Sequence, residues 1–136
     1  TSTLEAAGGG LGPEDVIRCH YTLEDGEAAA RRLLSGADRP TALICGNDVL
    51  AAGAMRGARH LGLNIPADLS VTGFDDIDLA TAVSPALTTV RVPHKRMGAS
   101  AGERLLEWID SGHQPQSLSY SAEFVFRDSL APPSSG

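Results

Sequence analysis

Short apolar runs alternate with helical patterns along this chain, and this alternation constrains the fold more than any other feature. The runs at 41–45 (TALIC), 70–74 (SVTGF) and 88–92 (TTVRV) have the length and composition of strands in the interior of a sheet. Strands that alternate with helices predict a parallel sheet with right-handed crossovers. The sequence therefore predicts an α/β fold, a parallel sheet flanked by helices, with ligands beyond the carboxyl ends of the strands.

Helix signals lie between the predicted strands. Thr22, with Asp25 three residues later, has the spacing of a capping box and predicts a helix that ends at 35–36. Asn47 predicts the start of a second helix, which ends at Gly62. Pro93 opens a long amphipathic helix that ends near residues 111–112.

Other segments give weaker signals. Residues 16–21 (VIRCHY) predict a further short strand, and two extended pieces are expected at 118–121 and 123–127. The Leu/Ala pattern of residues 1–7 predicts a helical remnant, as if the chain began within a helix. The Pro/Ser-rich tail, residues 130–136, is predicted to be disordered.

The charge balance limits the partners of this chain. Among its 136 residues, 17 are Asp or Glu and 11 are Lys or Arg, which gives a formal net charge of −6. Nucleic acids and anionic membranes are bound by clustered Lys and Arg, so we expect this chain to bind small molecules or proteins. It has no apolar stretch of the roughly 20 residues that span a bilayer and no signal-peptide pattern, which predicts a cytoplasmic location. Cys19 and Cys45 lie in apolar runs and are predicted to be reduced thiols of the core.

Candidate ligand-binding residues follow the predicted strands directly. They are Tyr21, Asn47 and Asp75. An aromatic ring, an amide that donates and accepts, and a carboxylate that accepts suit a polyhydroxylated or heterocyclic small molecule. Asn47 serves equally well as a helix cap, and Tyr21 equally well as a side chain packed on the helix after it. Asp75 has no evident packing role at its strand end, which favours ligand contact.

The neighbouring carboxylates are predicted to be structural. Asp48 suits the positive end of a helix dipole, and Asp76 and Asp78 are expected to cap a short turn over residues 77–82. Asp75 and Asp76 are adjacent, and adjacent carboxylates do not face each other across a substrate as a catalytic acid and base do.

No motif of a catalytic or metal site is present in the sequence. It contains no GxSxG, GxxxxGK[ST] or HExxH motif, and the glycines at 8–10 precede a predicted strand and do not open a helix. The histidines have no metal-ligand spacing; they are His20, His60, His94 and His113. We therefore expect no catalytic residue, no metal and no cofactor.

An ordered set of motifs resembles a known family. The motifs are GND at 46–48, LGLNIPADLSVTGFDD at 61–76, SPALTTVR at 84–91 and EFVFRDS at 123–129. One of them alone would be unspecific, but together, in this order and spacing, they resemble the LacI/GalR family of bacterial transcription regulators. The resemblance covers nearly the whole chain, from residue 21 to residue 129.

This resemblance implies the C-terminal lobe of a type I periplasmic-binding-protein-like fold, in which two α/β lobes close over a small effector, often a sugar or a nucleobase. Residues 1–129 would be a partial effector-binding domain that lacks the N-terminal lobe and the helix-turn-helix. Residues 93–117 would cross the hinge and pack on that lobe. By the same resemblance, Asn47 and Asp75 contact the effector and Tyr21 stacks on it.

One position departs from the family pattern. Val92 stands where the family often has Gln, and this change removes one polar contact to the effector.

The leading hypothesis is therefore the effector-sensing region of a LacI-type repressor, which is not an enzyme. A sugar or related metabolite would shift lobe closure and, through it, the operator affinity of the full-length protein, whose missing N-terminal domain would bind the DNA. One alternative is a solute-binding protein of the same fold that serves a sugar transporter. Another, a small flavodoxin-like enzyme or phosphate binder, has no supporting motif.

The long helix also predicts a protein partner. Met97, Ala101, Leu105 and Trp108 form one apolar stripe. Without the N-terminal lobe this stripe would be exposed to water. Burial of such a set of side chains stabilises a protein by roughly several kcal/mol. We expect a homodimer or a segment-exchanged oligomer to cover it.

Overall fold

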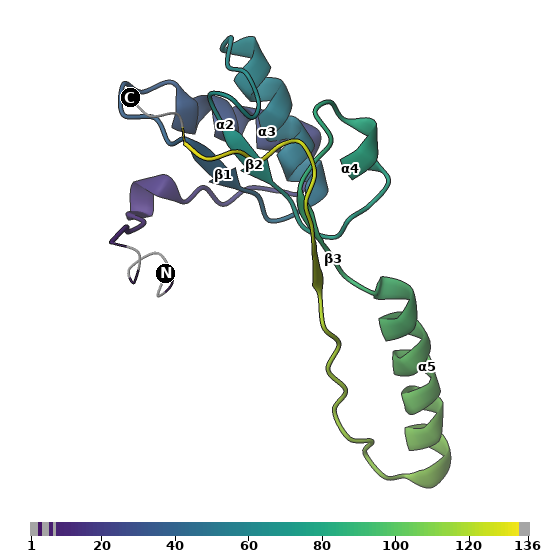
Figure 1. Ribbon diagram of the computed structural model, residues 1–136. Helices are drawn as coiled ribbons and strands as arrows, with labels where there is room; N and C mark the ends of the chain where they lie inside the picture. The colour runs from purple at the N-terminus through teal and green to yellow at the C-terminus, as the bar shows by residue number, and fades with distance from the viewer. Residues whose placement is uncertain (1–2, 4–5, 7, 134–136) are drawn as a thin grey trace.

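A computed structural model of the protein describes residues 3, 6 and 8–133 (Figure 1). The expected helical remnant at residues 1–7 lies mostly outside these residues. The elements in chain order are η1 (Pro13–Asp15), α2 (Leu23–Leu34), β1 (Ala42–Ile44), α3 (Asp48–His60), β2 (Ser70–Thr72), α4 (Leu79–Ala82), β3 (Thr89–Arg91), α5 (His94–Ser111) and β4 (Glu123–Val125).

The predicted parallel pairing is confirmed. β1 and β2 pair in parallel, with Leu43 opposite Val71. The ladder continues to β3, because Thr72 and Thr88 form a parallel bridge and the Gly73 N–H donates to the Thr88 carbonyl over 3.0 Å. β4, the second of the expected extended pieces, pairs antiparallel with β3. The sheet is therefore parallel with one antiparallel strand.

The predicted helix caps are also confirmed. The Thr22 hydroxyl accepts a hydrogen bond from the Asp25 N–H over 3.1 Å at the start of α2. The Asn47 side chain accepts one from the Leu50 N–H over 2.9 Å at the start of α3. Gly112 ends α5 in the left-handed conformation, at φ 69°, which glycine adopts without the strain of a Cβ.

Helices α2 and α3 approach each other at small residues. A Cβ on Gly26 would lie 2.5 Å from the Leu50 carbonyl oxygen, and a Cβ on Gly53 would overlap the Leu23 carbonyl oxygen and lie 2.9 Å from the Glu27 nitrogen. The two backbones can be this close only because these side chains are absent. Both helices contribute to the hydrophobic core, together with residues of the strands, α4 and the loops before β2 and β3. The core consists of Ala30, Leu34, Leu43, Ala51, Ala54, Met55, Ala58, Leu69, Val71, Ala80 and Leu87.

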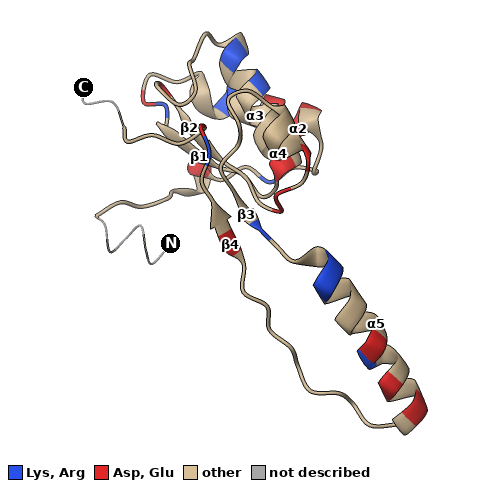
Figure 2. Cartoon of the chain, turned by 45° about the vertical axis from the view of Figure 1, so that its right-hand side comes forward, with Lys and Arg blue, Asp and Glu red and all other residues tan. Residues whose placement is uncertain are grey.

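Helix α5 projects from the body of the molecule, and the chain returns beside it as an extended segment to β4 (Figures 1 and 2). None of the residues of α5 is buried. Tyr120 in the returning segment donates a hydrogen bond to the Ser100 hydroxyl over 2.6 Å. The segment forms no strand at 118–121, because no other strand lies beside it. No helix in the described part of the chain is long and apolar enough to cross a membrane.

The prediction of a strand at 16–21 was wrong. This segment has no regular structure. Among the residues that the structure describes, no strand pairs with the other edge of β1, where Ile44 is 82% exposed. An apolar cavity of about 640 Å³ separates residues 10–19 from β1 and α2. Strand propensity becomes a strand only where a partner is within hydrogen-bonding distance.

The prediction that both cysteines belong to the core was wrong for Cys19. Cys19 is exposed, whereas Cys45, which directly follows β1, is half-buried, and both are free thiols. Burial, with a smaller contribution from Cys19, raises the pKa of the Cys45 thiol to about 12. Cys45 is therefore an unreactive thiol at neutral pH.

At the end of β4 the chain returns to the sheet. The Ala131 N–H donates to the Ser70 hydroxyl over 3.1 Å, and that hydroxyl donates to the Ala131 carbonyl over 2.9 Å. Ala131 lies in the segment 130–136 that the sequence predicts as a disordered tail, of which the structure describes residues 130–133.

The close approach of α2 and α3 leads to a test of stability. We expect Gly53→Ala to lower the free energy of unfolding by roughly 1–3 kcal/mol, because the added methyl group would force the helices apart. Urea denaturation monitored by circular dichroism measures this loss. Gly98→Ala is the matched control: a Cβ there meets no atom within 4 Å, so this change in an exposed helix should be neutral or stabilising by up to about 1 kcal/mol. Equal effects of the two changes would contradict the helix contact.

Candidate functional site

Loops from three parallel strands meet at their carboxyl ends. The Asp48 N–H, after β1, donates to the Phe74 carbonyl, after β2, over 2.9 Å. The Asp75 N–H in turn donates to the Val90 carbonyl of β3 over 2.9 Å. These bonds extend the sheet ladder into the loops, so residues far apart in sequence share one edge.

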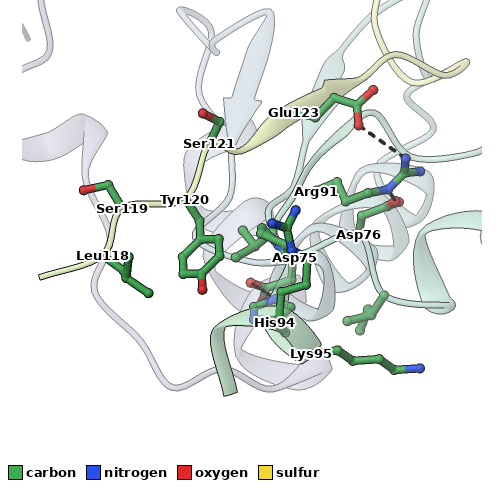
Figure 3. A pocket seen from close by; sticks show the side chains of 14 residues that line it. Asp75, Asp76, Arg91, His94, Lys95, Leu118, Ser119, Tyr120, Ser121 and Glu123 are labelled. Carbon is green, nitrogen blue, oxygen red and sulfur yellow. Dashed lines mark hydrogen bonds and ion pairs between the residues drawn. The ribbon is translucent and has the colours of Figure 1, made fainter. Parts of the chain in front are cut away.

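Asp75 is held in an unusual backbone conformation at this edge. Its φ is 107° and that of Asp76 is 54°, so two consecutive residues other than glycine have positive φ values, which are uncommon outside functional or constrained sites. The Asp75 side chain is 30% exposed, and its Oδ1 lies 3.3 Å from the His94 Nε2. Figure 3 shows the two side chains beside each other at the start of α5.

A cavity of about 990 Å³ lies next to Asp75 (Figure 3). It is at the upper end of the volumes typical of small-molecule sites. Its walls come from the loop after β2, the end of β3, the first turn of α5 and the segment that returns to β4. The lining residues are Asp75, Asp76, Ile77, Arg91, Val92, Pro93, His94, Lys95, Arg96, Leu118, Ser119, Tyr120, Ser121 and Glu123.

These walls combine polar groups with an aromatic ring. The Arg96 guanidinium lies over the Tyr120 ring, 5.6 Å from its centroid. Asp75 offers carboxylate acceptors and Tyr120 an aromatic face, a combination that suits a hydroxylated ligand, whereas the Ser119 and Ser121 hydroxyls point away from Asp75 (Figure 3). Tyr120 was not among the residues predicted from the sequence, because it reaches the cavity only through the return of the chain after α5 and no local motif marks it.

The structure separates the predicted site residues into two groups. Asp75 lines the cavity, whereas Tyr21 and Asn47 do not. Both lie beside Gly46: Asn47 follows it in sequence, and a Cβ on Gly46 would lie 3.3 Å from the Tyr21 ring, whose residue is 67% exposed. The cap role of Asn47 is confirmed, and ligand contact by any of the three residues stays a prediction.

Asp76 and Asp78 do not cap α4, contrary to the expectation. Asp78 stands at the N-cap position but forms no side-chain cap hydrogen bond. Asp76 accepts hydrogen bonds from Arg127 over 2.5 Å and from Arg91 over 2.7 Å. The Asp76 side chain is only 7% exposed, compared with 15% for Arg127 and 52% for Arg91. This ion pair ties the loop after β2 to β3 and to the segment after β4.

The two guanidinium groups determine the pKa of Asp76. Burial raises the pKa of this carboxyl, but the hydrogen bonds and charges of Arg127 and Arg91 together outweigh burial and lower it below its usual value. Asp76 is therefore ionised at neutral pH and contributes to folding rather than to proton transfer.

Three of the four histidines each contact a different carboxylate. His20 contacts Asp25, His60 contacts Glu27 and His94 contacts Asp75. No group of three His, Cys, Asp or Glu side chains in the described residues is close enough to bind a metal ion together.

Comparison with known proteins places this geometry in a family. The family profile described as periplasmic binding protein-like domain matches residues 4–130. The chain is 49% identical over 110 residues to the HTH-type transcriptional regulator MalR of Streptomyces coelicolor, with 81% of the chain and 30% of that protein covered.

Solved structures agree with the sequence relatives. A LacI family transcriptional regulator from Mycobacterium smegmatis superposes with a TM-score of 0.89 at 32% identity, over 98% of this chain and 50% of that one. The complex of the transcriptional regulator CelR with cellobiose superposes with a TM-score of 0.88 at 29% identity, over 95% of this chain and 40% of that one. The chain spans about a third of the length of the curated relatives it matches.

The contributions of Arg127 and Arg91 to stability through Asp76 can be measured separately. Arg127→Met removes the less exposed partner of Asp76 together with the hydrogen bond that Arg127 donates to the Leu87 carbonyl over 2.8 Å, and we expect a loss of about 1.5–3 kcal/mol in the free energy of unfolding at pH 7, the scale of a hydrogen bond to a charged group. Arg91→Met is the matched control and should cost less, because water already reaches half of Arg91. Urea denaturation of both variants provides the comparison.

The stabilisation by the Asp76–Arg127 interaction should also depend on pH. Because the pKa of Asp76 is lower in the folded than in the unfolded chain, its stabilisation is complete above the unfolded-state pKa of about 3.9 and is lost as pH falls through the folded-state pKa. The difference between wild type and Arg127→Met should shrink over this acid range. A difference that is constant from neutral pH to well below the pKa of Asp76 would contradict the assignment.

Proposed function

Because this chain belongs to the periplasmic binding protein-like domains of the LacI/GalR regulators, we propose that it is the effector-sensing region of a transcriptional regulator. The effector is a small hydroxylated molecule of the sugar class, and it biases the closure of the domain. The observation that carries this proposal is the position of Asp75, a constrained carboxylate at the carboxyl edge of the parallel sheet, on the wall of a cavity of about 990 Å³.

Several features support a binding role over a catalytic one. The relative and the structures described above are named as transcriptional regulators, and one of them is a complex with cellobiose. These names favour a regulator over a transporter's solute-binding protein. The acidic surface also fits a sensing module, because the DNA contacts of such a regulator need clustered basic residues from another part of the protein.

The regulatory consequence follows from thermodynamic linkage. If effector binding changes operator affinity by some factor, operator DNA changes effector affinity by the same factor. In this proposal the chain contributes the effector side of that coupling, and a separate DNA-binding part of the protein contributes the other side.

We also propose that α5 is covered by a second protein surface, through dimerisation or segment exchange. Its exposed apolar side chains include Met97, Leu105 and Trp108, members of the predicted stripe, together with Leu106 and Ile109. The chain exposes 9125 Å², whereas a compact monomer of this mass is expected to expose roughly 6,700 Å². The excess of roughly 2,400 Å², to which α5 contributes together with the other exposed segments of the chain, is more than one partner buries in a standard interface.

Effector binding is tested by thermal shift on the full protein that contains this chain. The panel consists of sugars, beginning with cellobiose, and nucleobases. A ligand at 100 times its dissociation constant should add about 2.7 kcal/mol of stability. We expect Asp75→Ala to weaken binding of the responding sugar by about 1–3 kcal/mol in calorimetry, with folding little changed. Asp78→Ala is the control, because Asp78 is exposed and outside the cavity lining.

Two outcomes would contradict the proposal. Unchanged affinity in Asp75→Ala would remove Asp75 from the site. A protein that responds to no member of the panel but turns over a substrate would favour an enzyme.

The oligomer is tested by size-exclusion chromatography with light scattering on the chain. We expect a dimer or larger species, and Leu105→Glu should shift it toward monomer because it places a charge in the apolar stripe. Glu103→Gln, on the opposite side of the same helix, should leave the mass unchanged. A wild-type chain that stays a stable monomer would contradict the proposal.

A further inference from the structure

Asp48 is a buried carboxylate whose contacts exceed those of a helix cap. It is 0% exposed and is the first residue of α3. Its Oδ2 accepts a hydrogen bond from the Ile77 N–H over 2.9 Å, and its Oδ1 accepts one from the Thr89 hydroxyl over 2.5 Å. An ionised carboxylate is costly to bury unless such donors surround it. The side chain therefore joins α3 to β3 and to the loop after β2.

The bond to Ile77 closes the turn that contains Asp75. Backbone hydrogen bonds reach this turn on both sides, because Phe74 accepts from the Asp48 N–H and Asp75 donates to Val90. Between Phe74 and Ile77, Asp75 and Asp76 both have positive φ values. Such a conformation persists only where surrounding contacts impose it, and Asp48 provides two of those contacts, one from its backbone and one from its carboxylate.

The sequence leaves room for this carboxylate. A Cβ on Gly73 would overlap the Asp48 Oδ1 and lie 2.9 Å from the Leu87 side chain. Glycine at position 73 thus allows the carboxylate to reach both donors at once. The position of the Asp48 carboxylate therefore depends on the absence of a side chain at Gly73.

We propose that Asp48 is a positioning residue for the effector site, which fixes the turn that presents Asp75 to the cavity. This inference rests on the proposed function for the role of Asp75. It assigns Asp48 no contact with the effector, because Asp48 is not among the residues that line the cavity. Its effect passes through the Ile77 and Phe74 hydrogen bonds.

The proposal is tested by residue-resolved amide hydrogen exchange, which needs no ligand. In Asp48→Asn, a nearly isosteric change, the Asp75 and Ile77 amides should exchange about tenfold faster or more, because the Ile77 N–H exchanges a carboxylate acceptor for the weaker amide oxygen of asparagine. The Val71 amide, which donates to Ser129 in the core, should keep its protection relative to wild type. Faster exchange throughout the molecule would show a merely structural role, and no change at Asp75 and Ile77 would also overturn the proposal.

Matched variants separate the contacts. Thr89→Val removes the other donor to Asp48 but leaves the Ile77 bond, so the turn should keep its protection relative to the core. Asp68→Asn changes a second carboxylate that accepts a backbone N–H, that of Asn64 over 2.8 Å, and should leave the turn unaffected. If Asp48→Asn does not fold, Asp48→Ser, whose shorter side chain takes the carboxylate away from the Ile77 N–H, should give the same local increase in exchange.

A functional readout then links the turn to binding, with cellobiose as the probe. Asp48→Asn should weaken cellobiose binding several-fold in the wild-type background but add little in Asp75→Ala, since both changes remove the same contact. Full additivity of the two changes would contradict a role through Asp75. A protein that binds no sugar or nucleobase would overturn the proposed function, whereas the exchange result would separately decide whether Asp48 fixes the turn.

Discussion

The parallel hydrogen-bond ladder through β1, β2 and β3 is the constraint on which the rest of the structure depends. It brings three strand ends to one edge, and it continues past β2 as the bond from the Asp75 N–H to the Val90 carbonyl. Helices α2 and α3 complete this arrangement by packing closely at Gly26 and Gly53. The candidate site is therefore built in part from the loops at that edge, where ligands bind in open α/β sheets.

Buried carboxylates fix the shape of those loops. Asp48 receives its hydrogen bonds from Thr89 and Ile77, and Asp76 receives its own from Arg127 and Arg91. Between these two carboxylates lies Asp75, whose positive φ is uncommon for a residue other than glycine. The candidate site is thus presented by charged groups that need not touch a ligand.

Two parts of the chain remain exposed: one edge of β1 and the helix α5. β1 has a free edge, and α5 contributes no buried residue. The chain spans only about a third of the length of its curated relatives, which fits the proposal that effector sensing and DNA binding belong to a longer protein. Figure 2 shows α5 with basic residues at its start and acidic residues toward its far end, an arrangement opposite to the helix dipole. The charges at its two ends therefore do not stabilise α5 through the helix dipole, which fits the proposal that another protein surface packs on this helix.

The sequence by itself determined the local structure and the order of the elements. Thr22 and Asn47 mark helix starts because a cap needs only a side-chain oxygen and the next turn of backbone. The apolar runs marked the parallel strands, and their ends identified Asp75. Only the tertiary structure decided the partners of Asp76, which lie 15 and 51 residues away, the place of Tyr120 in the cavity and the absence of a strand at residues 16–21. The physical reason is the range of the interactions: capping and periodicity act within a few residues, whereas ion pairs and strand pairing depend on which distant segments the fold brings together.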